Sequence, residues 1–151
     1  EHTTYRSKKG VCTMAVDFSK SKTRENLMRA FAGESQARNR YTIAAKQAGE
    51  IICIPLARFF LFTADQERAH AEVFYELLEQ TEQTIEICGG YPVNLAENVT
   101  DLLKSAVHNE MQEFEDFIGI AKIAKEEGFD QAAGAFDMIA KVEAVHGRRF
   151  A

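Results

Sequence analysis

The stretches Glu67-Arg68-Ala69-His70 and Glu143-Ala144-Val145-His146 share one pattern, a glutamate followed three residues later by a histidine. On an α-helix this spacing places both side chains on the same face, one turn apart. Either stretch alone is a weak signal, because an ion pair on a helix surface has the same spacing. Together they predict two helices that each present a carboxylate and an imidazole in the same direction.

A lone glutamate lies 33 residues before each pattern, Glu34 in the first half of the chain and Glu110 in the second. A single shift of 76 residues superposes one set on the other, which defines six residues: Glu34, Glu67, His70, Glu110, Glu143 and His146. Apolar positions obey the same shift, since Leu27 then meets Leu103. A helical hairpin duplicated about a pseudo-two-fold axis is the simplest interpretation.

Apolar residues recur at steps of three and four along four segments, which predicts four long helices. Their expected ranges are 23–48, 55–80, 94–127 and 130–151. Residues 81–93 contain Gly-Gly and Tyr-Pro, are not helical in pattern, and exceed the length of a tight turn. The prediction is an all-α four-helix bundle with a long crossover between its second and third helices.

The ends of these helices carry recognisable capping residues. Thr23 and Asp130 are expected as N-caps of the first and fourth helices. Pro55 suits the first position of the second helix. The third helix is expected to open with Asn94-Leu95-Ala96-Glu97, which is close to a capping box, and to stop at Gly128.

Glu113, three residues after Glu110, adds a seventh ionisable residue to the apolar stripes. Singly, each of the seven could pair with a surface neighbour or extend its charged end to solvent. Burying an ionised carboxylate costs several kcal/mol, whereas the free energy of unfolding of a whole domain is only ~5–15 kcal/mol. Five core glutamates therefore need compensating positive charge, which two divalent metal ions would supply. The arrangement also matches a known dimetal design in helical bundles.

The donor types narrow the choice of metal. Carboxylate-rich donors with one imidazole for each ion and no thiolate favour iron or manganese over structural zinc. Two non-haem iron ions are the prediction, with manganese or zinc as possible substitutes in a preparation.

Composition excludes several other classes of protein. A net charge of −5 and a pI of about 5.4 argue against a nucleic-acid-binding protein. No apolar run has the ~18 residues of a membrane span. Cys12, Cys53 and Cys88 form no Cys-x-x-Cys pair, which favours reduced thiols in a cytoplasmic protein. Residues 1–20 are polar, irregular and without a signal-peptide core, so residues 21–151 are expected to form the bundle.

Three stretches carry specific motifs: AGESQARNRY at 32–41, TADQERAH at 63–70 and AKIAKEEGF at 121–129. In these motifs, and over about residues 20–151, the sequence resembles the rubrerythrins. The resemblance implies a ferritin-like bundle with a non-haem di-iron centre. The activity that it implies is the reduction of hydrogen peroxide to water.

The resemblance also implies a role for each metal ligand. Glu67 and Glu143 would bridge the two irons, and Glu34 would be a terminal ligand of the first iron. Glu110 and His146 would be terminal ligands of the second.

The first iron would take either Glu113 or His70, exchanging them with its redox state. Glu113 has Ala37 as its counterpart under the 76-residue shift, so it breaks the internal repeat and distinguishes rubrerythrins from ferritins. Tyr41 is expected either to support a ligand carboxylate by a hydrogen bond or to be a core aromatic residue. Phe117 stands where many relatives have a tyrosine.

A rubredoxin domain, which most rubrerythrins carry, would require Cys-x-x-Cys pairs, and the chain has none. The electrons are therefore expected from a separate rubredoxin-type donor or from a domain that this chain lacks. The alternatives to a peroxidase are an O₂-using ferroxidase and an iron-binding or storage bundle. The resemblance favours a homodimer, formed with or without exchange of hairpins between two chains.

Overall fold

A computed structural model describes residues 16–50, 53–78, 83–94 and 96–151, and within these ranges it is helical without strands. A short 3-10 helix, η1, spans Phe18–Lys20. Four long helices follow: α1 (Lys22–Glu50), α2 (Ile54–Glu76), α3 (Val99–Glu127) and α4 (Asp130–Phe150). The predicted all-α four-helix bundle is confirmed. Residues 79–82, which belong to the predicted second helix and crossover, lie outside the described residues.

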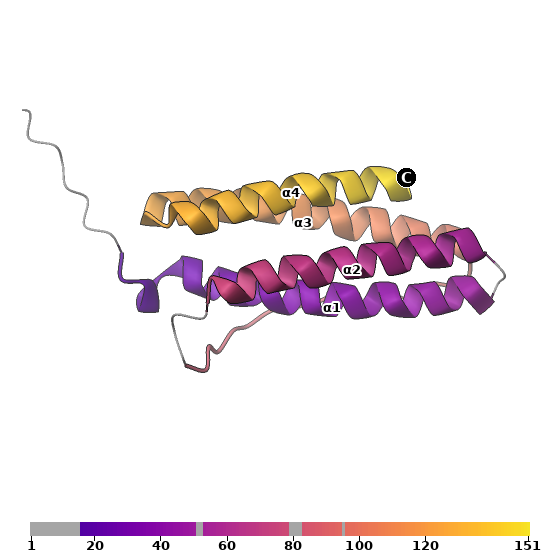
Figure 1. Ribbon diagram of the computed structural model, residues 1–151, viewed down its shortest axis with the longest axis horizontal. Coiled ribbons are helices and arrows are strands. Elements are labelled where there is room, and N and C mark those ends of the chain that lie inside the picture. Colours follow the sequence, from indigo (N-terminus) through magenta and orange to yellow (C-terminus); the bar gives the residue numbers. More distant parts are fainter. Residues whose placement is uncertain (1–15, 51–52, 79–82, 95) are drawn as a thin grey trace, which may run out of the picture.

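The helices form two antiparallel hairpins, α1 with α2 and α3 with α4, which lie side by side (Figure 1). The connection from α2 to α3 returns along the length of the bundle, so α2 and α3 run in the same direction. This is the long crossover predicted from the sequence, and its described part, residues 83–94, contains no helix. The crossover allows two equivalent hairpins to face each other within one chain.

The first helix begins in a different way from the prediction. Ser21 lies just before α1, and its hydroxyl accepts a hydrogen bond from the Arg24 amide at 3.0 Å. Thr23, the predicted N-cap, is inside the helix, where its amide and hydroxyl donate to Glu127 at 2.8 and 2.6 Å. The Lys22 amide donates to the same carboxylate at 2.9 Å. A glutamate at the end of α3 therefore caps α1, which a local motif could not reveal.

Two further capping predictions are wrong. The N-cap of α3 is Asn98, whose side chain accepts from the Asp101 amide at 3.0 Å, so the helix begins several residues after the predicted capping box at Asn94. Asp130 is the first residue of α4 and not its N-cap; its carboxylate lies 2.7 Å from the ammonium of Lys125. The stop at Gly128 is confirmed, since this glycine has a left-handed φ of 91°.

The crossover is bound to α1 by three polar contacts. Arg29 donates from Nε to the carbonyl of Cys88 at 3.0 Å, and Tyr91 donates to the carbonyl of Arg29 at 3.3 Å. About two turns further along α1, Gln36 donates to the carbonyl of Pro92 at 3.0 Å. These contacts hold an otherwise irregular segment along the bundle.

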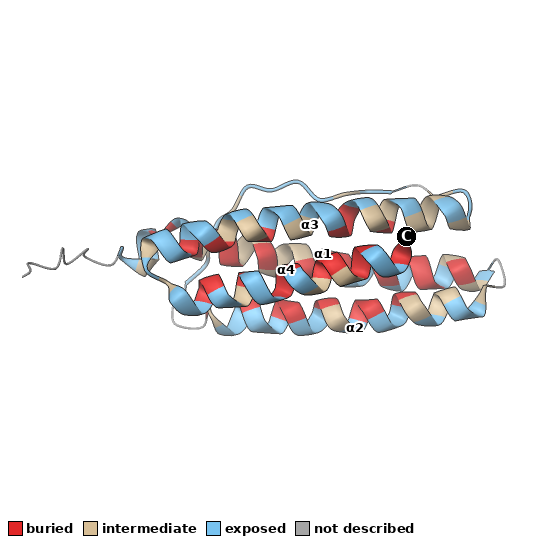
Figure 2. Cartoon of the chain, turned by 90° about the horizontal axis from the view of Figure 1, so that it is seen from above, coloured by how far each residue is buried: buried red, intermediate tan, exposed pale blue. Residues whose placement is uncertain are grey.

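Buried residues form a continuous stripe along the inner faces of the helices (Figure 2). Two apolar clusters occupy the two halves of the bundle, one built around Phe74, Phe117 and Phe136, the other around Tyr41, Phe60 and Phe150. Between them lies a layer of buried glutamates and histidines. Among the described residues, no helix is long and apolar enough to cross a membrane.

Candidate metal centre

Each of the four long helices places one glutamate in the polar layer. Glu34 on α1, Glu67 on α2, Glu110 on α3 and Glu143 on α4 are at most 1% exposed. Each helix has apolar residues on the same face one or two turns away on either side, so packing of these residues draws the carboxylate inward. The six residues related by the 76-residue shift are therefore all buried, as their position in the stripes predicts.

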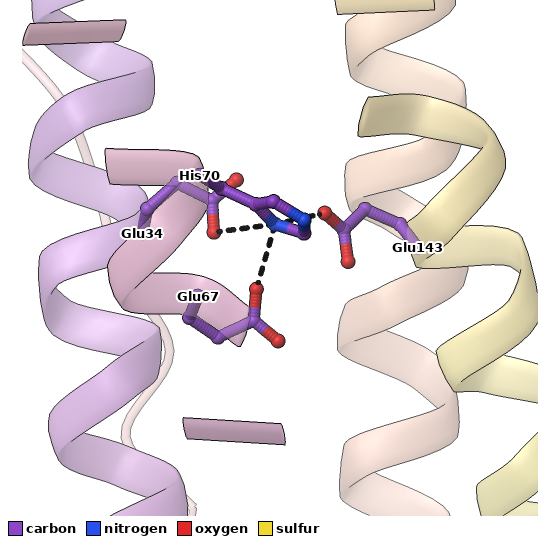
Figure 3. Close-up of side chains that lie close together, drawn as sticks. All are labelled: Glu34, Glu67, His70 and Glu143. Carbon is purple, nitrogen blue, oxygen red and sulfur yellow. Dashed lines mark hydrogen bonds and ion pairs between the residues drawn. The ribbon is translucent and has the colours of Figure 1, made fainter. Parts of the chain in front are cut away.

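The first group of possible metal ligands gathers around His70 (Figure 3). Nδ1 of this histidine lies 2.8 Å from Glu143 Oε1, 3.1 Å from Glu67 Oε2 and 3.7 Å from Glu34 Oε2. Three helices, α1, α2 and α4, thus contribute to it. One donor atom from each of the four residues lies within 4.8 Å of all the others, which is close enough to share one ion.

The second group gathers around His146. Its Nδ1 lies 2.9 Å from Glu143 Oε2 and 3.3 Å from both Glu67 Oε1 and Glu110 Oε2. Donor atoms of these four residues again lie within 4.8 Å of one another. Glu67 and Glu143 belong to both groups, and the two imidazole rings are 5.9 Å apart, centre to centre. The geometry is that of two adjacent cation sites with two carboxylates between them.

The charges in this layer are poorly balanced by protein groups alone. Burial raises the pKa of Glu34 well above its usual range, and it raises the pKa of Glu110 to about 8. Burial by itself would lower the pKa of His70 and His146, but their contacts with the carboxylates outweigh it and raise both pKa values to about 12. The layer therefore takes up protons when it holds no other cation.

The pKa of Glu143 is shifted in the opposite direction from those of Glu34 and Glu110. Burial would raise its pKa, but hydrogen bonds with His146 and His70 and the charges of these imidazoles lower the pKa to about 2. A carboxylate that stays ionised between two cations is the expected behaviour of a group shared by both ligand sets.

Several oxygens in the layer have no hydrogen-bond donor among the described residues. Both carboxylate oxygens of Glu34 and Oε1 of Glu67 are buried in this state. Buried polar atoms are nearly always paired, because an unpaired one costs stability. Oxygens that converge on one point with free lone pairs fit a pair of hard divalent cations, so the donor set suits the predicted metals.

Two further side chains support the ligands. The Tyr41 hydroxyl on α1 donates to Glu110 Oε1, as one of the two expectations for this residue requires, while its ring packs in the second apolar cluster. Gln66, which the sequence analysis missed, has its side-chain oxygen 3.0 Å from His146 Nε2. This contact holds a proton on Nε2 and leaves Nδ1 directed at the carboxylates. Gln66 could have been found as the residue four positions before His70 on the same helical face.

Glu113 belongs to neither group among the described residues. Its carboxylate lies 3.7 Å from Arg40 Nη2, and its side chain is 23% exposed. Arg40 is held in turn by Gln36, which accepts from its Nε at 2.8 Å. Burial, followed by repulsion from Glu110 and Glu143, raises the pKa of Glu113 well above its usual range. The structure thus brings six of the seven predicted ligands together and holds the seventh at the edge.

The fold and this site define a class, the carboxylate-bridged dimetal proteins built on the ferritin-like bundle. A structure of nigerythrin in a partially reduced state superposes with a TM-score of 0.75 at 30% identity, covering 98% of this chain and 77% of that one. A structure of the bacterioferritin from Desulfovibrio desulfuricans, a protein with a diiron site, superposes with a TM-score of 0.75 at 25% identity, covering 85% of this chain and 75% of that one.

The sequence comparisons narrow the class to one family. The rubrerythrin family model matches residues 25–151. Rubrerythrin from Clostridium perfringens is 42% identical over 133 residues, which are 86% of this chain and 68% of that protein. Rubrerythrin from Porphyromonas gingivalis is 41% identical over 131 residues, 86% and 64% of the two chains. The chain belongs to the rubrerythrin family, and its cofactor is a pair of non-haem iron ions.

Proposed function

We propose that this protein is a non-haem di-iron peroxidase that reduces hydrogen peroxide to water as a defence against oxidative stress. Membership of the rubrerythrin family and the two adjoining ligand groups support an iron-dependent oxidoreductase. The observation that carries the finer proposal is Glu113, a carboxylate beside the cluster and outside both groups. A centre that only loads and stores iron with six ligands does not require this additional carboxylate.

In this proposal Glu67 and Glu143 hold the two ions together, since each has one oxygen in contact with each histidine. Glu34 is a terminal ligand of the first ion, and Glu110 and His146 are terminal ligands of the second. When bound, two ferrous ions would supply one electron each, which with two protons converts one hydrogen peroxide to two waters.

The remaining residues adjust the centre and move protons. His70 and Glu113 are alternative ligands for the first ion: the imidazole suits the ferrous state, and the anionic carboxylate suits the ferric state. Burial raises the pKa of Glu113 well above its usual range and so favours its protonated form, and Glu113 would release that proton on becoming a ligand. Tyr41 stays protonated, since burial raises its pKa well above the usual range, and it keeps Glu110 oriented.

The electron donor in this proposal is a rubredoxin-type protein or domain, and the protein is a cytoplasmic homodimer. The free thiols of Cys53 and Cys88 are compatible with a reducing compartment. Within one chain the two hairpins already supply both ligand groups, so exchange of hairpins between chains is not needed to build the centre. A sizing column with light-scattering detection tests the dimer, and a cage-sized assembly would favour storage instead.

Rapid mixing tests the reaction directly. Iron-loaded protein is first analysed for two iron ions per chain, then reduced anaerobically and mixed with hydrogen peroxide or with O₂. We expect oxidation by peroxide to be faster by orders of magnitude, and a Glu113→Ala variant to lose most of that advantage. If O₂ oxidises the protein as fast and ferric mineral accumulates, the protein is a ferroxidase or storage protein and the peroxidase proposal is wrong.

A further inference from the structure

A cavity of about 770 Å³ lies between α1 and α3 beneath the crossover. Glu34 and Glu113 border it from opposite helices, and Tyr91 and Pro92 of the crossover cover it. The cavity therefore reaches the first ligand group from the side, at the one carboxylate that stands outside the cluster. A second cavity of about 350 Å³ continues along the same seam, past Tyr41.

Asn109 on α3 borders both cavities. It is only 7% exposed, and its Nδ2 has no hydrogen-bond acceptor in the part of the chain that the structure describes. It lies next to Glu110 in the sequence and four residues before Glu113, so it shares the helical face of Glu113. A buried amide without a partner destabilises the fold, so its presence at this point requires another explanation.

The other amides that border the larger cavity are paired. The side-chain oxygen of Asn26 accepts from Arg29 at 3.4 Å, and Gln112 donates to Asp116 at 3.0 Å. Among the described residues, Asn109 Nδ2 is the buried side-chain amide nitrogen without a partner, so it is free to meet a molecule in the cavity. The carboxylate of Glu34, whose two oxygens have no donor among the described residues, offers acceptors on the opposite wall.

A molecule that binds to both walls must accept a hydrogen bond from Asn109 and donate one to Glu34. Hydrogen peroxide has two oxygens that each do both. We propose that Asn109 is a substrate-binding residue, whose Nδ2–H donates a hydrogen bond to one oxygen of hydrogen peroxide in the cavity between α1 and α3. This inference rests on the proposed peroxidase function and adds the residue that receives the substrate beside the metal centre.

The test compares Asn109→Leu, which has a similar size and no donor, with Asn109→Ser, which keeps a short donor. Asn39→Leu is the matched control, because Asn39 is exposed on α1, lies outside both cavities, and donates from its side chain to the carbonyl of Ser35. Each reduced, iron-loaded protein is mixed with increasing hydrogen peroxide, and the second-order rate constant is measured. Loss of one neutral hydrogen bond to substrate predicts an about threefold to tenfold decrease for Asn109→Leu. Asn109→Ser should be intermediate, and Asn39→Leu unchanged.

A second measurement, on the metal-free proteins, separates binding from structure. Replacing an unpaired buried amide by an apolar side chain should leave the urea midpoint of unfolding of Asn109→Leu unchanged or higher. If the rate falls in both Asn109 variants together with the unfolding midpoint, the residue is structural and the inference is wrong. If the wild-type protein reacts quickly with peroxide and Asn109→Leu reacts equally quickly, the inference is also wrong. If the wild-type protein shows no preference for peroxide over O₂, the peroxidase proposal itself fails.

Discussion

Glu34 and Glu67 are both fully buried carboxylates in the same layer, yet their positions predict different losses of metal binding when each is replaced. Glu67 belongs to both ligand groups, whereas Glu34 belongs only to the first among the described residues. Substitution of Glu34 by glutamine should therefore weaken the binding of one metal ion and leave the binding of the other unchanged. The same substitution of Glu67 should weaken both.

The size of the difference follows from linkage. At a free metal concentration of 100 times its dissociation constant, one ion stabilises the folded state by about 2.7 kcal/mol, so two ions contribute about 5.4 kcal/mol. Glu34→Gln should lose up to about half of this stabilisation, and Glu67→Gln up to all of it. In the metal-free protein, the effect of Glu34→Gln on stability should have the opposite sign. Burial raises the pKa of Glu34, so the ionised carboxylate costs free energy in the folded metal-free protein above about pH 4.5. Glutamine removes that cost, and metal-free Glu34→Gln should be at least as stable as the wild type above about pH 4.5.

The assay is an anaerobic titration of metal-free protein with ferrous iron or cobalt(II), followed by thermal unfolding at matched free metal. Wild type should bind two ions, Glu34→Gln one with wild-type affinity, and Glu67→Gln neither. Glu50→Gln is the control, because Glu50 is an exposed glutamate on the same helix as Glu34. Equal losses in the Glu34 and Glu67 variants, or full binding by both, would refute the shared-ligand geometry.

Three other predictions follow from single contacts. Metal binding should release at least one proton per ion, because contacts with carboxylates raise the pKa of His70 and His146 to about 12 and a ligating nitrogen must be unprotonated. Metal affinity should thus rise about tenfold per pH unit for each proton released. Calorimetry in buffers of different ionisation enthalpy measures the number of protons released. Binding heats that do not depend on the buffer would contradict this prediction. Tyr41→Phe removes the donor to Glu110 and should lower the affinity of the second ion about 10- to 100-fold, seen as a shift of one titration phase and not both. Glu127→Gln should lower the free energy of unfolding by about 1 kcal/mol at pH 7, since this carboxylate caps the start of α1. Burial would raise the pKa of Glu127, but its hydrogen bonds lower it, so the difference between variant and wild type should disappear in acid, as urea unfolding at pH 7 and pH 3 would show.

Much of the metal centre was predictable because helical periodicity converts sequence spacing directly into direction. Glu67 and His70 lie on one face of any helix that contains both, and the apolar residues around them decide that this face is buried. The internal shift then relates them to Glu143 and His146. The ligand set, the bundle and the position of the crossover followed from these local rules, and the structure and the family relationship confirm the fold and the cofactor.

Contacts between segments far apart in the chain were not predictable in this way. The capping of α1 by Glu127 joins residues about 105 positions apart, and the contact between Gln66 and His146 spans 80. The N-cap prediction at Thr23 was wrong for the same reason, whereas those at Asn94 and Asp130 were wrong because α3 begins after Asn98 and α4 begins at Asp130 itself. A capping motif indicates only which nearby backbone amides a side chain can bind. In the folded protein, other side chains can bind these amides instead.

The sequence by itself determined that two Glu-x-x-His patterns, their upstream glutamates and Glu113 belong to one bundle core, because spacing and burial are set along each helix. Spacing along the chain could not decide which carboxylates are shared; the family resemblance implied Glu67 and Glu143, and only the tertiary structure shows the contacts that make them so. Glu67 and Glu143 face each other across the two hairpins and touch both histidines, while Arg40 holds Glu113 at the edge of the cluster. Sharing depends on distances between helices, and these are set by how the two hairpins pack and not by the order of residues within either one.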